Sequence, residues 1–368
     1  MPIYTYRNNW ERTNLRVKLD NDWKNTAPYV YVNGAWKKAL KPVPPGLIIP
    51  YNGTTAPAGW SLFTAADGKF VVGAGGTYAV GATGGTTSLT TIESTVQGVH
   101  TSTTGACSYN YSPAVSGTKP AGAHSHTLTY TYVPPYYGLR LIKAGSGLTT
   151  LPTNAVMFAD TSMPGLSRFS SGDGKLFSAR ASIGAGGNNT INSFTSSSSG
   201  SHAHGTSNGS ALGDYVFRNV SASGSHTHPS ATFTITPNLY RALLSAWTNV
   251  SNAFALQSGM YAFYESTTPP EGWYLCDGSN GTLDLRNYFI EYATENNQGT
   301  RTGNGSISVP SITLSSITNT HNHISGNGKS QDESYHRNYN NTHSHTIPPS
   351  NPTFLPPYYA LAIITLKS

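Results

Sequence analysis

Charged residues are scarce in this chain: Asp, Glu, Lys and Arg make up 10% of its 368 residues, against about 25% in an ordinary globular protein. So little charge does not suit a helical enzyme, and the net charge of +6 is too small for a classically disordered chain. Gly, Ser, Thr, Asn and Pro fill the gap. This composition predicts a mostly β, turn-rich fold with little helix, stabilised in part by oligomerisation or by a metal.

Cysteine and long apolar runs are also lacking. The two cysteines, Cys107 and Cys276, are too few for a disulfide scaffold, and we expect both to be free. A run of about 18 apolar residues, which a transmembrane helix needs, does not occur. Residues 1–3 do not lead into the basic and then apolar segments of a signal peptide. We therefore expect synthesis in the cytoplasm, no membrane insertion, and export, if any, as part of an assembly.

A pure basic run is missing as well. The basic residues near the start of the chain are interleaved with Glu11, Asp20 and Asp22. This mixture is typical of a solvated surface, whereas nucleic-acid binding needs a strongly basic patch. We therefore predict no nucleic-acid partner.

Histidine, by contrast, follows a fixed pattern, since ten of the twelve histidines stand in five His-x-His pairs. Residues i and i+2 of a strand point to the same face, about 6–7 Å apart. Both imidazoles of a pair can then bind one ion, and imidazole is a ligand for Zn, Cu, Fe and Ni. Polar ladders on strand surfaces are the alternative. With one further histidine in register, the candidate ligands are His100, His124, His126, His202, His204, His226, His228, His321, His323, His343 and His345.

Three stretches of the chain follow one plan, which indicates an internal repeat. The first and third end in Pro-Pro-Tyr-Tyr, at 134–137 and 356–359, and the second ends in a diverged form at 237–244. Each ending predicts an apolar strand that follows a proline bend. A histidine pair precedes each ending, and an earlier histidine element precedes each pair; in the first repeat that element is His100 alone, because Ser102 stands in the trailing position.

We divide the chain into an N-terminal piece, 1–45, and repeats at 46–144, 145–247 and 248–368. In the N-terminal piece Asn33-Gly34 lies between two strand-like runs and predicts a β-hairpin. We interpret this piece either as small strand units with one core tryptophan each or as an adaptor that attaches to a larger assembly. Within the repeats, Gly/Ser stretches such as 184–187 are interpreted as hairpin excursions between the histidine elements.

The surroundings of the pairs favour a structural metal over a catalytic one. No Asp or Glu lies between Ser94 and Ala144, whereas a metal enzyme keeps an open coordination position and a general base. Three pairs around one ion supply six nitrogens and leave no position open. Six nitrogens favour an octahedral ion such as Fe(II), with Ni or Zn as alternatives. We therefore predict no enzymatic activity.

The third repeat resembles a known domain. Gly272-Trp273-Tyr274-Leu275-Cys276-Asp277-Gly278, followed by Asp284-Leu285-Arg286-Asn287-Tyr288-Phe289, is similar to the Gly-Trp-x-Leu-Cys-Asp-Gly and Asp-Leu-Arg-x-x-Phe elements of the bacteriophage tail-collar domain. The resemblance is strong over 248–368, fair over 46–144, weak over 145–247, and absent from the first 45 residues. The histidine pairs resemble the metal-binding needles of phage short tail fibres and fibre tips.

That resemblance implies three collar-like units wound about one axis, each running out along a needle and returning. It also implies an octahedral iron held by three His-x-His pairs. Because three units follow one another here, we expect one chain to close on itself as a pseudo-trimer; a homotrimer with stacked collars is the alternative. One metal layer would use the pairs that end at 126, 228 and 345. The other would use His100 with the pairs at 202/204 and 321/323.

The resemblance further implies a virion component of the tail that attaches to the host, bound to other tail or baseplate proteins through residues 1–45. Loops beyond the histidine pairs would form the distal tip, where tyrosine offers a large contact area at low entropic cost. Packing within the tip is the alternative role for these aromatic residues. Those expected to contact a host surface glycan or protein are Tyr109, Tyr111, Tyr215, Phe217, Tyr335 and Tyr339.

Two other functions are considered. One is a purely architectural tail hub or plug that matches three-fold to six-fold symmetry. The other is a depolymerase of surface polysaccharide, which would need a pair of carboxylates. The carboxylates available for that reaction are Glu265, Glu271, Asp277, Asp284, Glu291 and Glu295.

Overall fold

The architecture is that of a computed structural model of the chain. It describes residues 16–19, 22–25, 29–32, 35–38, 42–93, 125–192, 194–196, 227–228, 232–294, 299–324 and 336–367. In this part of the chain the regular structure is β-strand, with two short 3₁₀ turns, η1 (Thr64–Ala66) and η2 (Ser170–Gly172), and no α-helix. The prediction of a mostly β protein with little helix is confirmed.

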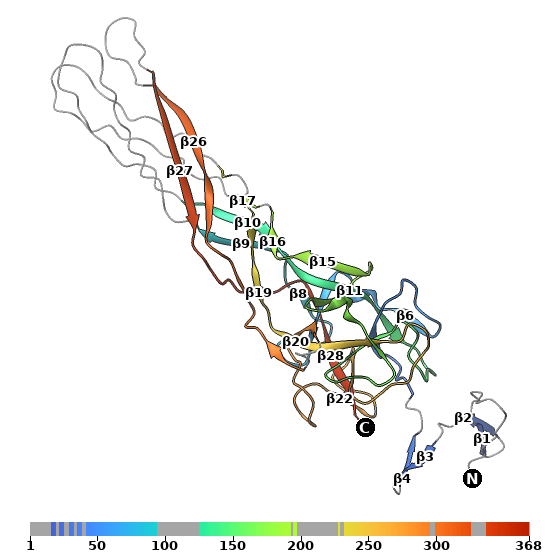
Figure 1. Cartoon of the computed structure of the whole chain (residues 1–368). Coiled ribbons are helices and arrows are strands. Elements are labelled where there is room, and N and C mark those ends of the chain that lie inside the picture. Colours follow the sequence, from blue (N-terminus) through green and yellow to red (C-terminus); the bar gives the residue numbers. More distant parts are fainter. Residues whose placement is uncertain are drawn as a thin grey trace, which may run out of the picture.

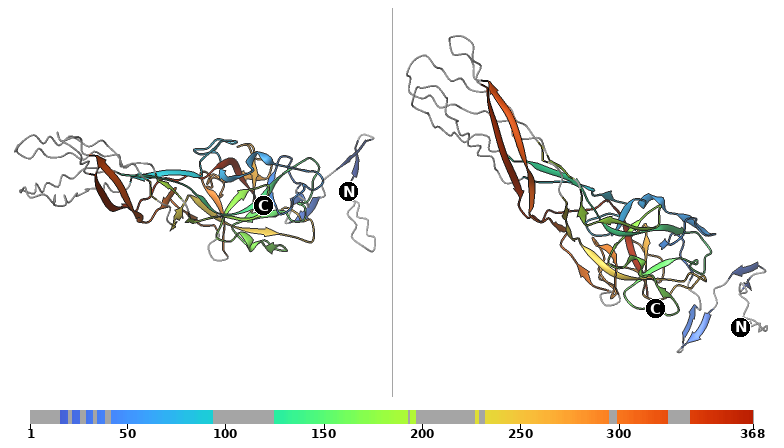
Figure 2. Two further views of the ribbon diagram at one scale, coloured as in Figure 1. Left: turned by 90° about the horizontal axis from the view of Figure 1, so that it is seen from above. Right: turned by 45° about the horizontal axis from the view of Figure 1, so that its top comes forward.

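A body of short strands carries a longer hairpin that extends away from it (Figure 1). The hairpin is formed by β26 (Ile312–Ile324) and β27 (His336–Ile347). Nearer the body, β9 (Ser88–Glu93) pairs with β10 (Thr127–Thr131). Both further views in Figure 2 show these strands on the same side of the body. We call this projection the needle, and its end next to the body the needle root.

Within the body, the three predicted repeat ranges supply corresponding strands in the same order, which we name by their position. The opening strands are β5 (Ile48–Tyr51), β12 (Val156–Ala159) and β21 (Met260–Tyr264); the inner strands are β7 (Lys69–Gly73), β14 (Leu176–Ala179) and β23 (Phe289–Tyr292); the flanking strands are β8 (Thr83–Gly84), β15 (Gly184–Asn188) and β24 (Arg301–Thr302); the closing strands are β11 (Val133–Ala144), β20 (Arg241–Thr248) and β28 (Tyr358–Leu366).

The pairings of these strands are cyclic. Each closing strand runs antiparallel to the opening strand of its own range. It also runs parallel to the inner strand of the next range: β11 with β14, β20 with β23, and β28 back with β7. The register is the same each time, with Tyr136 opposite Leu176, Arg241 opposite Phe289, and Tyr358 opposite Phe70. The third range thus closes onto the first.

The three inner strands also contact one another. Single residue pairs join β7 to β23 and β14 to β23, and two pairs join β14 to β7. Alternate inner-strand residues face different apolar clusters. Val71, Phe177 and Ile290 belong to the central cluster of the body, whereas Phe70 and Leu176 belong to the cluster beneath the needle. The period of two along a strand therefore divides the core into layers.

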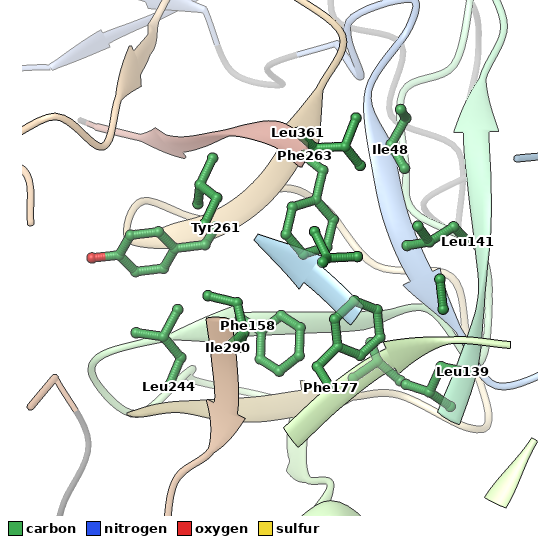
Figure 3. Packing of buried hydrophobic residues seen from close by; sticks show 14 of the residues in the cluster. Ile48, Leu139, Leu141, Phe158, Phe177, Leu244, Tyr261, Phe263, Ile290 and Leu361 are labelled. Carbon is green, nitrogen blue, oxygen red and sulfur yellow. The ribbon is translucent and has the colours of Figure 1, made fainter. Parts of the chain in front are cut away.

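The central cluster draws side chains from all three ranges (Figure 3). Phe177 is fully buried, its ring stacks on Phe263 at a centroid distance of 5.7 Å, and it meets Phe158 edge-on at 5.4 Å. A further cluster contains both Leu47, at the start of the first range, and Leu366, near the end of the last. Both ends of the three-range body therefore lie in one apolar layer.

Truncating Phe177 to alanine should lower the free energy of unfolding by about 3–5 kcal/mol, because the packed ring leaves a cavity among side chains from three ranges. Denaturant unfolding measures the loss. Val250→Ala is the matched control, since Val250 is 65% exposed and its truncation should change stability by no more than about 0.5 kcal/mol. A loss at Phe177 no larger than that of the control would contradict this core.

The predicted hairpin at Asn33-Gly34 is confirmed, since Val32 pairs with Ala35 across it. The Gly184–Gly187 stretch differs from its prediction as a hairpin excursion: it lies in β15, which pairs with β11. The remaining strands are β1 (Arg16–Leu19), β2 (Asp22–Asn25), β3 (Tyr29–Val32), β4 (Ala35–Lys38), β6 (Trp60–Leu62), β13 (Ser167–Arg168), β16 (Thr190–Ile191), β17 (Thr195–Ser196), β18 (Phe233–Thr234), β19 (Thr236–Asn238), β22 (Trp273–Leu275) and β25 (Ser306–Ser308).

Candidate metal centre

Three histidines from the three repeat ranges meet at the needle root. His126, His228 and His345 are each buried, with exposed fractions of 0%, 4% and 1%. Their ring centroids lie 4.6 Å apart for 126 and 228, 4.8 Å for 126 and 345, and 5.1 Å for 228 and 345. One nitrogen from each ring lies within 4.8 Å of the others. We call this group the histidine trio.

Local structure holds each member in place. His126 lies just before β10, whose Leu128 pairs with Ser196 of β17. The backbone N–H of His228 donates to the Ser196 hydroxyl at 2.7 Å, and that hydroxyl lies 3.3 Å from the His228 carbonyl oxygen. His345 lies in β27, opposite Leu314. Ser196 thus links β10, which begins right after His126, to the backbone of His228, a role that sequence reasoning missed because Ser196 begins an ordinary-looking serine run.

Apolar residues lie next to the trio along the same segments, since Leu128 and Ile347 follow His126 and His345 by two residues and Leu314 pairs with His345. Leu128, Leu314 and Ile347 are buried beneath the needle, at most 1% exposed. Buried polar groups need partners, because removing them from water is otherwise unfavourable. The three imidazoles provide nitrogen donors in a buried site.

The donor set fits a transition-metal ion. Imidazole nitrogens bind such ions at about 2.0–2.1 Å, so three nitrogens on one face of an octahedron lie about 3 Å apart. The nitrogens of the trio already lie within 4.8 Å of one another, so binding requires the three rings to draw closer together. The trio could supply half of an octahedral shell. A structural ion of this type would connect the three ranges.

The other predicted ligands are only partly accounted for. His343 lies two residues before His345 on β27, and its backbone pairs with Ile317. His321 and His323 lie on β26, opposite Tyr339 and Arg337. Their side chains are outside the described part of the chain. The remaining predicted ligands, also outside the described residues, are His100, His124, His202, His204 and His226.

The predicted receptor-contacting aromatics lie almost wholly outside the described residues. Tyr339 is placed on β27 by its backbone. Tyr109, Tyr111, Tyr215, Phe217 and Tyr335 fall outside the described residues.

Two of the candidate carboxylates, Asp277 and Asp284, face each other across a β-bridge. Hydrogen bonds from Ser279 lower the pKa of Asp277, and the Arg286 guanidinium lowers the pKa of Asp284. A glycosidase pair needs one carboxyl with a raised pKa to act as the acid. Neither member of this pair has one.

Two of the other candidate carboxylates take part in ion pairs. Glu265 forms an ion pair with Lys143, and buried Glu291 forms one with Arg241. Burial raises the pKa of Glu291, and Arg241 opposes that rise. Glu271 is exposed, and Glu295 lies outside the described residues.

Cys276 is free, as expected, and it is also buried, whereas Cys107 is outside the described residues. Among the described residues no helix has the length and apolar character needed to cross a membrane. Comparisons with models of protein families, with curated proteins and with solved structures found no match to this chain. The interpretation of the site therefore depends on its own chemistry.

Proposed function

We propose that this chain is a non-enzymatic structural protein of a phage tail fibre or tail tip, folded as a single-chain pseudo-trimer of three collar-like units. The observation that carries the proposal is the histidine trio, whose members come from three separate ranges of one polypeptide. These histidines are far apart in the sequence, and their meeting at one place is what three ranges around a common axis would produce.

The cyclic strand pairings support closure within one chain. We call the contact between the closing strand of one range and the inner and flanking strands of the next range a junction. Every junction repeats the same parallel pairing in the same register, including the one that returns from the last range to the first. In a stacked homotrimer each range would instead pair with copies of itself. Closure within one chain therefore favours the monomeric pseudo-trimer over the homotrimer.

The metal acts in this proposal as a clamp at the needle root. With the preceding histidines of each pair, His124, His226 and His343, the trio would supply six imidazole nitrogens. That shell favours Fe(II), with Ni or Zn as alternatives. A filled shell has no position for substrate or water, which supports a structural role. The engaged carboxylates argue in the same direction against the depolymerase.

The elongated form suits attachment to a host surface. The described β26–β27 hairpin already projects from the body (Figure 1). In this proposal the protein is a virion component made in the host cytoplasm, residues 1–45 bind other tail or baseplate proteins, and the loops at the tip bind a host surface glycan or protein. A purely architectural hub or plug is the second candidate, since closure and the metal clamp serve that role equally well.

The proposal is tested by the mass and metal content of protein purified without chelator. Native mass spectrometry should show a monomer that carries at least one transition-metal ion per chain. A stable homotrimer would contradict single-chain closure, and a monomer with less than one ion per chain would contradict the clamp. Cryo-electron microscopy of the assembled particle then separates the two candidates, because a hub lies on the tail axis and a fibre tip lies at a distal end.

A further inference from the structure

The three junctions between successive ranges share a backbone arrangement but differ in the side chains that fill it. At each junction, one closing-strand residue pairs directly with one flanking-strand residue of the next range. Two of these pairs join a tyrosine to a glycine, and the other joins an arginine to a threonine. The pairs are Tyr136 with Gly186, Arg241 with Thr302, and Tyr358 with Gly84.

At the tyrosine junctions the glycine makes room for the ring. A Cβ on Gly186 would lie 2.3 Å from the Tyr136 hydroxyl oxygen, and a Cβ on Gly84 would lie 2.9 Å from ring carbon Cε1 of Tyr358. Such distances are far shorter than van der Waals contact, so any other residue would displace the ring. A second group then covers each ring. The Arg180 guanidinium lies 4.2 Å from the Tyr136 ring centroid, and the Tyr78 ring lies 4.7 Å from that of Tyr358.

At the arginine junction, polar side chains replace the tyrosine–glycine pair. The Nε of Arg241 donates to the Thr302 hydroxyl at 3.1 Å, and its Nη1 lies 2.8 Å from Oε2 of Glu291. Glu291 is only 7% exposed. The parallel register places Ser178 and Val72 at the positions that correspond to Glu291 in the other two junctions. The carboxylate that pairs with Arg241 is therefore particular to the third range.

If the closing strand of one range docked on a range other than its own neighbour, these groups would be mismatched. A tyrosine closing strand docked on the third range would meet Thr302 where it requires a glycine, and would leave the Glu291 carboxylate buried without a cation. Arg241 docked on the first or second range would face Val72 or Ser178, neither of which carries a charge. A buried charge that loses its partner is strongly destabilising.

We infer that these residues are specificity determinants that fix the cyclic order of the three ranges and hinder pairing out of order, whether within one chain or between ranges of two copies. The inference rests on the proposed single-chain closure and adds what enforces it. A stacked homotrimer would place the third range against itself, with Tyr358 beside Thr302 and Glu291 at all three junctions. Specificity therefore comes from unfavourable mismatches as well as from matched contacts.

The test converts the arginine junction into a copy of the Tyr358 junction. The triple variant Arg241→Tyr, Thr302→Gly, Glu291→Val is compared with its three single variants and with wild type. Each protein is refolded at concentrations that approach the effective concentration of linked units, about millimolar, and its oligomeric state is measured by native mass spectrometry. Lys143→Gln with Glu265→Gln is the matched control, because that ion pair also joins two ranges but both side chains are more than one-third exposed.

Each single variant should unfold at a lower temperature than wild type. The triple variant should recover, with a coupling of about tenfold or more in the unfolding equilibrium constant beyond the sum of the single effects. It should also form oligomers at high concentration, while wild type and the control remain monomeric. A triple variant that stays monomeric like wild type, or that does not fold, would overturn the inference. A trimeric wild type would instead overturn the closure on which the inference rests.

Discussion

Alanine at Gly303 is expected to destabilise the protein by about 3–6 kcal/mol, combining backbone strain with steric overlap. Gly303 follows β24 with a φ of +93°, a conformation that residues with a Cβ rarely adopt. Its Cβ would lie 1.6 Å from the carbonyl oxygen of Leu239, in the preceding range. Because that obstacle is backbone rather than a movable side chain, the junction between the second and third ranges would have to separate locally.

Gly68→Ala separates the two contributions. Gly68 has a similar φ of +82°, but nothing lies within 4 Å of its added Cβ. This control should therefore show backbone strain alone, about 1–2 kcal/mol. Denaturant unfolding measures both variants, and equal losses at the two sites would show that the close approach of Gly303 to Leu239 does not exist.

Gly85 and Gly187 occupy the corresponding places at the other two junctions. Both have positive φ, and a Cβ at either would lie 2.1 Å from a proline carbonyl oxygen, that of Pro356 or Pro134. One glycine per junction thus lets the closing strand of one range pass close to the next. This shared feature complements the side chains that distinguish the junctions.

Removing one imidazole of the trio, by His126→Gln, should lower the metal content by one ion per chain. The free energy of unfolding should fall by about 3–4 kcal/mol, which is what a ligand present at 100 to 1,000 times its Kd contributes. Glutamine keeps a polar side chain of similar length at this buried position. Elemental analysis and thermal unfolding, each with and without a chelator, measure the two effects.

His336→Ala is the control for this substitution, because His336 stands in no His-x-His pair. It should keep both the metal and the stability of wild type. In chelator, wild type should lose most of its advantage over His126→Gln, since the ion then stabilises neither protein. A His126→Gln protein that binds as much metal as wild type would show that the trio is not a metal site.

Much of the site could be predicted from the sequence because its signals are local and repeated. The spacing of the histidine pairs and their place in the three repeats led to the expectation that residues 126, 228 and 345 share one layer. The structure brings these three together. The hairpin at Asn33-Gly34 was predictable for the same reason, since a two-residue turn fixes the pairing of its neighbours.

The junctions could not be predicted because the residues that contact each other there are far apart in the sequence. Gly186 resembles a linker residue until Tyr136 is placed opposite it. Glu291 and Arg241 are fifty residues apart, and neither shows on its own that it is half of a buried ion pair. The parallel pairing of closing and inner strands has no signature within either strand. One signal does recur in the sequence: a glycine stands two or three residues after the first residue of each flanking strand, at 85, 187 and 303.

The cyclic body has a consequence for how variation is distributed around the needle. In a fibre built from three identical chains, one codon change alters all three sides at once. In the proposed single-chain fold each range is encoded separately, so one range can change in sequence while the other two are unaltered. Saturation mutagenesis of the gene would therefore measure the tolerance for substitutions in one range at a time.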